Sequence, residues 1–195
     1  MVALVSDAHI ISIGGLGLLG TLLALAAWHD VKSYRIPNAI VYGGAATALA
    51  LHAFLPVGLG FAGAIPGGIG FFPAFGGLTV GLLALLPLYL LRAAGAGDVK
   101  LMAMTGAFLG PVDAIGAVIL TGIAGAVLAA VFALRARAVR RMASNLRLIG
   151  YSLLARMVAV EGPSFDPKRD TAAKIPYSIA IAAGTLAWIV IRYWR

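Results

Sequence analysis

The sequence predicts an all-α, polytopic integral membrane protein with six transmembrane helices. Of its 195 residues, 62% are hydrophobic and 11% are charged, whereas about a quarter of the residues in a soluble domain usually carry charge. The apolar residues form long runs, and a helix needs about 20 of them to cross a hydrocarbon core about 30 Å thick. The length favours one integral membrane domain over residues 1–195.

Six apolar runs are the predicted spans. Residues 1–31 contain no Lys or Arg, so the basic part of a cleavable signal peptide is missing and the first run is expected to stay as a helix. The fourth run is the shortest, and Pro111 and Asp113 predict a tight turn before the fifth. The runs cover residues 8–29, 36–55, 74–92, 98–112, 114–134 and 174–192.

Residues 56–73 are apolar but rich in Gly and Pro, which favours a loop or re-entrant segment. The alternative, a seventh span, would put Asp30 and Asp98 on opposite membrane faces. Two small-residue spacings elsewhere, Gly77-xxx-Gly81 and Gly106-xxx-Gly110, predict close helix packing.

The distribution of basic residues predicts the orientation. Six spans put the segments 30–35, 92–100 and 135–174 on one face, and the other face receives only Arg192 and Arg195. Cytoplasmic loops carry the excess of Lys and Arg, so the first face is assigned to the cytoplasm and both termini to the outside, which is the periplasm in a bacterium. That face collects 13 of the 15 basic residues: Lys32, Arg35, Arg92, Lys100, Arg135, Arg137, Arg140, Arg141, Arg147, Arg156, Lys168, Arg169 and Lys174.

The large cytoplasmic loop is predicted to contain an amphipathic helix around residues 145–160, lying on the anionic inner leaflet. Nucleic acid is not an expected partner, because the basic residues lie at helix ends on one membrane face. The chain has no Cys, and His9, His29 and His52 show no ligand spacing, so we expect no metal.

Asp30 and Asp98 border predicted spans at the cytoplasmic boundary. Two facing carboxylates can share a proton and activate water for peptide hydrolysis. In the alternative interpretation, Asp98 only caps the fourth helix and Asp30 is a solvated helix end beside Lys32. Spacing and topology leave both interpretations open.

The residues around these aspartates resemble the prepilin peptidase family, the GxGD-type aspartyl endopeptidases that process type IV pilins. Asp30 precedes an (I/L)PN element, here Ile36-Pro37-Asn38. Asp98 ends a GxGD element, here Gly95-Ala96-Gly97-Asp98. Lys174-Ile175-Pro176-Tyr177 is similar to the family's late proline–aromatic element. The resemblance covers about residues 20–190.

The resemblance implies that Asp30 and Asp98 are catalytic and that the substrate is a prepilin or pseudopilin. Its short basic leader would be removed at the cytoplasmic face of the bacterial inner membrane, without a cofactor. The two prolines named below are expected in the first turns of their spans. The two glycines either leave room for an extended substrate or only form the turn before Asp98. Asn38 either binds a carboxylate or substrate, or completes its helix start. Lys32 and Lys100 either anchor the chain at the inner membrane face or contact acidic groups or lipid. The expected substrate-binding or neighbouring residues are Gly95, Gly97, Pro37, Asn38, Lys32, Lys100 and Pro176.

Larger family members carry paired CxxC elements in a zinc domain and also N-methylate the trimmed pilin. This chain, without Cys, therefore looks like the short branch that serves Tad/Flp pili. S-adenosylmethionine would be needed only if the chain also methylates. The rival interpretations are an archaeal-type preflagellin peptidase, a presenilin-like protease, a small transporter or assembly factor, and a scaffold. The oligomeric state stays open.

Overall fold

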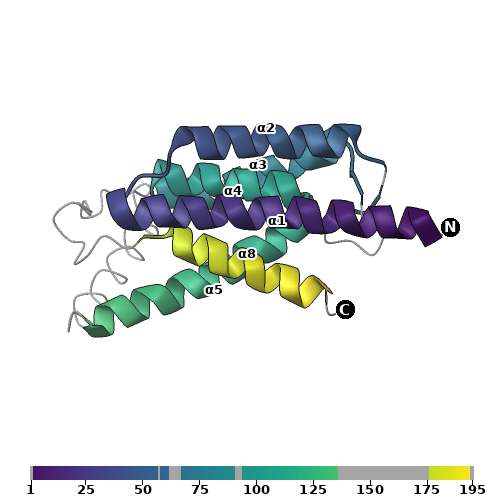
Figure 1. The fold of residues 1–195 in the computed structure, drawn as a ribbon. Coiled ribbons are helices and arrows are strands. Elements are labelled where there is room, and N and C mark those ends of the chain that lie inside the picture. The colour runs from purple at the N-terminus through teal and green to yellow at the C-terminus, as the bar shows by residue number, and fades with distance from the viewer. Residues whose placement is uncertain (1, 57, 62–66, 91–93, 136–175, 194–195) are drawn as a thin grey trace, which may run out of the picture. The chain divides into compact units, whose positions relative to one another are not determined.

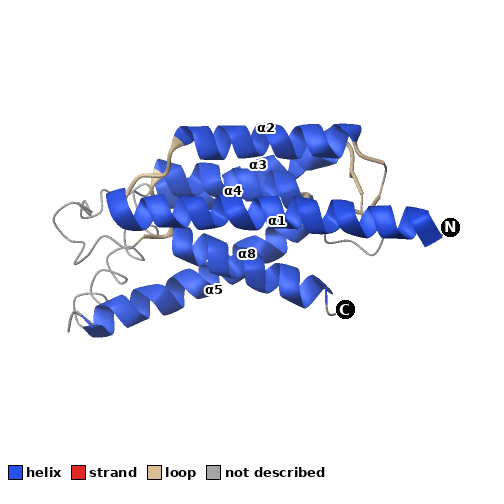
Figure 2. Cartoon of the chain, viewed as in Figure 1, coloured by secondary structure: helices blue, strands red, loops and turns tan. Residues whose placement is uncertain are grey.

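The computed structural model describes residues 2–56, 58–61, 67–90, 94–135 and 176–193. These residues form six α-helices and no strand, which confirms the all-α prediction (Figures 1 and 2). The helices are α1 (Val2–Ser33), α2 (Asn38–Phe54), α3 (Phe71–Leu90), α4 (Ala96–Leu109), α5 (Pro111–Arg135) and α8 (Ser178–Tyr193).

Three helices are long and apolar enough to cross a membrane: Ile13–Ser33 within α1, Phe71–Leu90 and Pro111–Phe132. α2 and α8 are shorter apolar helices. α4 has 14 residues, or about 21 Å at 1.5 Å per residue, against a hydrocarbon core of about 30 Å. The six helices of the described residues lie where the six apolar runs predict helices, whereas six complete spans stay a prediction.

The chain divides into two compact units. The first contains Met1–Gly125 and Pro176–Arg195, and the second contains Ala126–Ile175. Of the second unit, the structure describes the end of α5. The predicted amphipathic helix at 145–160 lies outside the described residues.

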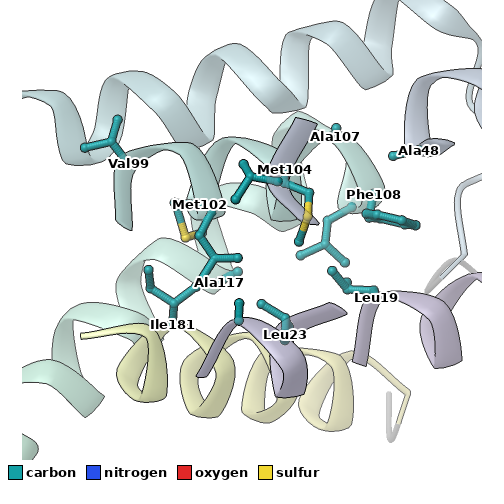
Figure 3. Close-up of a cluster of buried hydrophobic side chains, with 14 of the residues drawn as sticks. Leu19, Leu23, Ala48, Val99, Met102, Met104, Ala107, Phe108, Ala117 and Ile181 are labelled. Carbon is teal, nitrogen blue, oxygen red and sulfur yellow. The ribbon is translucent and has the colours of Figure 1, made fainter. Parts of the chain in front are cut away.

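The core of the first unit is built around α4, which packs against α1, α2, α3 and α8. Every residue from Leu101 to Gly110 is buried. Figure 3 shows α4 side chains, among them Met102, Met104 and Phe108, beside Leu19 and Leu23 of α1 and Ile181 of α8. A short helix enclosed by other helices has no need of a polar face, which explains why its apolar residues show no one-sided pattern.

α3 and α4 lie close together because glycines face each other across their interface. A Cβ atom on Gly77 would collide with the carbonyl oxygen of Gly106, and one on Gly81 with that of Met102. Small residues allow helix backbones to approach in this way. The predicted role of the two small-residue spacings in close packing is confirmed.

We therefore expect Gly77→Ala to lower the free energy of unfolding by about 2 kcal/mol, because the colliding atoms belong to backbone that cannot rotate away. Gly76→Ala is the matched control, since a Cβ there would meet nothing within 4 Å. Unfolding in detergent, followed by circular dichroism, measures both variants. Equal stability of the two variants would contradict the close approach.

The described part of the segment between α2 and α3 is a loop, as predicted, although Phe71, Phe72 and Pro73 already belong to α3. The loop is held by backbone bonds from Gly58 N–H to the Gly68 carbonyl and from Gly68 N–H to the Pro56 carbonyl, each 2.7 Å long. Glycines bring these backbone segments together because a Cβ on Gly67 or Gly68 would strike backbone atoms.

Two predicted boundaries near the aspartates are wrong by a few residues. α1 continues to Ser33 instead of ending at residue 29, and α2 begins at Asn38 instead of residue 36. Pro37 precedes α2 in an extended conformation with φ −61° and ψ 130°, and Pro176 also precedes the helix that follows it. Both prolines stand just before their helices, where proline's missing N–H costs no intrahelical bond.

Candidate active site

The end of α1 turns sharply beside Asp30. Tyr34 adopts the left-handed conformation with φ 51°, and its N–H donates to the Asp30 carbonyl over 2.8 Å. This geometry is a common way to end a helix, although glycine is the usual residue there. The chain then extends to Pro37 and enters α2, so Asp30 and the start of α2 border the same space.

That space is a cleft with a volume of about 490 Å³. The end of α1, the start of α2 and the start of α4 supply its walls. We call it the aspartate cleft, and its lining residues are Asp30, Ser33, Tyr34, Arg35, Ile36, Pro37, Asn38, Gly95, Ala96, Gly97, Asp98 and Lys100. It brings together, from distant parts of the chain, both aspartates and most of the neighbours that the sequence predicts.

Asp98 lies in the first turn of α4, outside the three helices that qualify as spans. Its Oδ2 accepts a hydrogen bond from the Gly95 N–H over 3.0 Å. Asp98 thus does cap α4, from the third helical position and not from the N-cap. A Cβ on Gly95 would lie 3.1 Å from this oxygen, so a side chain there would crowd the carboxylate.

Burial is the main cause that raises the pKa of Asp98 to about 6, against an ordinary value of 3.8. The hydrogen bond from Gly95 lowers this pKa, because it favours the charged carboxylate. The negative charge of Asp30 raises it again. The two aspartates therefore interact electrostatically within the cleft.

Asp30 is 7% exposed and contacts the start of α8. Its Oδ2 accepts a hydrogen bond from the Ser178 hydroxyl over 2.6 Å and another from the Ser178 N–H over 3.3 Å. The preceding residue, Tyr177, is near enough to Asp98 for that charge to raise its pKa further, after burial as the main cause. Ser178 thus contacts Asp30, and the neighbouring Tyr177 lies within range of the charge of Asp98.

Asn38 and Lys100 connect α2 with α4 at the edge of the cleft. The Lys100 Nζ donates to the Asn38 Oδ1 over 3.2 Å and lies 5.1 Å from the centre of the Tyr42 ring. The Asn38 amide oxygen is therefore already bonded to a side chain of the protein, and α2 has no side-chain cap bond at its start.

Two predicted site residues do not line the cleft. Lys32 lies over the ring of Trp28, 4.3 Å from its centre, and Pro176 is buried just before α8. Gly97 does line it, and a Cβ there would be in ordinary contact with Ile36 at 3.4 Å. Among the described residues, no group of three or more His, Cys, Asp or Glu side chains could hold a metal ion.

Sequence reasoning did not identify Ser178, Tyr34 or Arg35 as site residues. Tyr34 and Arg35 follow Asp30 closely, and their proximity could have indicated them. Ser178 is 148 positions away from Asp30, and a serine at a helix start is ordinarily a cap for its own helix. No local signal in the sequence connects it with an aspartate on another helix.

One comparison with known proteins identifies the family. No curated protein and no solved structure matches the chain significantly. The model of the type IV leader peptidase family matches residues 17–130, a range that includes both aspartates and the whole lining of the cleft. The match supports a leader peptidase role for a membrane-associated protease and agrees with the motifs around Asp30 and Asp98, and we conclude that this chain belongs to the type IV leader peptidase family.

Proposed function

We propose that this protein is an aspartyl endopeptidase that removes the short basic leader from Flp/Tad-type prepilins at the cytoplasmic face of the bacterial inner membrane. One observation carries the proposal: Asp30 and Asp98 line one cleft, and the charge of Asp30 raises the pKa of Asp98. Paired carboxylates whose ionisation is coupled in this way are typical of aspartic proteases.

In the proposed mechanism, the two aspartates share one proton and hold a water molecule between them. The ionised carboxylate takes a proton from the water while the water oxygen bonds to the scissile carbonyl carbon. The protonated carboxyl donates its hydrogen to the carbonyl oxygen. When the carbon–nitrogen bond breaks, a proton returns to the leaving amine, so no metal and no covalent intermediate are required.

The position of the cleft supports a substrate that is itself a membrane helix. Asp30 lies in the last turn of the long apolar helix α1, so the cleft opens where an apolar segment ends. A prepilin helix held in the bilayer would present its leader junction at that depth and would be aligned at little further entropic cost. The choice of a Flp/Tad-type prepilin rests on the resemblance of this chain to the short branch of the family.

The test is co-expression of this protein with a Flp-type prepilin, followed by mass spectrometry of the pilin N-terminus. We expect a single new N-terminus at the leader junction, absent from cells that carry the prepilin alone. Prepilin that stays intact beside a folded, membrane-inserted enzyme would overturn the Flp/Tad assignment. A preflagellin substrate should then be tried.

A further inference from the structure

Ser178 donates hydrogen bonds to Asp30 and, among the described residues, none to Asp98. Its side chain is fully buried, and both its hydroxyl and its N–H point to the Asp30 Oδ2. Hydrogen bonds to an ionised acceptor are short and strong, and the bond from the Ser178 hydroxyl to this oxygen is 2.6 Å long. The same side chain of Asp30 also lines the aspartate cleft.

The helix that carries Ser178 adds to the difference between the surroundings of Asp30 and Asp98. Ser178 is the first residue of α8, so Asp30 lies at the N-terminal end of that helix, where unpaired N–H groups favour negative charge. Ser178 follows the N-cap position of α8, which is Tyr177, whose carbonyl accepts the Ile181 N–H over 3.1 Å. Here the hydroxyl donates to a carboxylate on α1, and Asp30 takes the place of the cap.

The partners of Asp98 differ in number and kind. Its described hydrogen bond comes from one backbone N–H of its own turn, and burial outweighs that bond. In the described part of the chain, the other titratable groups that line the cleft are Tyr34, Arg35 and Lys100, and Tyr177 lies within range of the charge of Asp98. Lys100 is bonded to Asn38.

We propose that Ser178 is a positioning residue that keeps Asp30 as the ionised member of the pair, so that Asp30 is the general base and Asp98 carries the proton. This inference rests on the proposed function and gives each aspartate one role. Asp30 takes the proton of the attacking water, and Asp98 donates its proton to the scissile carbonyl oxygen. Ser178 touches neither water nor substrate and acts through Asp30.

The test compares Ser178→Ala and Ser178→Thr with the wild type, using purified enzyme and a prepilin. Ser178→Ala removes the hydroxyl but keeps the N–H, and we expect kcat to fall about 10-fold, as for the loss of one hydrogen bond to a charged group. The acidic limb of the pH–rate profile should move to higher pH, because the charged form of the base loses a donor. Ser178→Thr, which keeps a hydroxyl, should have the kcat and the acidic limb of the wild type.

Thr185→Val is the matched control. Thr185 lies in the same helix and is also fully buried, but its hydroxyl has no hydrogen-bond partner among the described residues. Its loss should therefore leave both the rate and the pH–rate profile unchanged. A lowered rate for Ser178→Ala with an unmoved acidic limb would show a packing role and overturn the inference, as would a wild-type rate. In both cases the wild type would still cleave the prepilin, so the proposed function would stand.

Discussion

Asp30→Asn and Asp98→Asn are each expected to lower prepilin cleavage by at least about 10³-fold, since general acid–base catalysis contributes about 10² to 10⁴ and each variant removes one member of the pair. Asn has the shape of Asp but cannot take or release the proton. Both side chains line the cleft, and the isosteric change preserves its volume. Cleavage rates of purified variants, at equal amounts of folded protein, measure the effect.

Asp113→Asn is the matched control for the two active-site variants. Asp113 is also 7% exposed, but it lies at the start of α5, which follows the end of α4 remote from the cleft. It accepts a hydrogen bond from the Trp188 Nε1 over 3.2 Å and pairs with Arg192 at 3.2 Å. We expect this variant to cleave at the wild-type rate, and an equal loss in all three variants would show that the effect is one of folding and contradict the aspartate pair.

The cleavage reaction is expected to lose activity as pH rises through about 6. Burial and the charge of Asp30 raise the pKa of Asp98 to about 6, and above that pH both carboxylates are ionised and no proton is left for the scissile carbonyl. The specificity constant kcat/KM should then fall about tenfold per pH unit, because it reports the ionisation of the free enzyme. Because the ionisations of the two aspartates are coupled, the pKa read from this fall in kcat/KM belongs to the pair and not to one residue.

The measurement is kcat/KM for prepilin cleavage from about pH 4 to about pH 9, with enzyme stability followed in parallel. Like kcat/KM, the stability of the folded protein is expected to fall as pH rises. Between the ordinary pKa of 3.8 and the raised pKa of about 6, the folded protein binds more protons at Asp98 than the unfolded chain does, so the free energy of unfolding falls as pH rises. A kcat/KM that stays constant through this range would contradict a catalytic proton on Asp98.

Most elements of the fold could be predicted from the sequence, because long apolar runs in a chain with few charges become helices in a membrane. Gly77 and Gly106 could also be assigned to close packing, because small residues at that spacing let helices approach closely in a membrane. The ends of the helices were harder to predict from the sequence. α1 continues past Asp30 because no residue before Tyr34 interrupts it, and Pro37 acts only on the conformation of its neighbour.

The two aspartates and the glycines around Asp98 were predicted from their local motifs, and so was the order in which they occur. Only the tertiary structure decided what surrounds them. Lys100 meets Asn38 across 62 positions of sequence, and Ser178 meets Asp30 across 148. A motif records which residues stand near one another along the chain, whereas the difference between the two carboxylates depends on donors that packing brings from other helices.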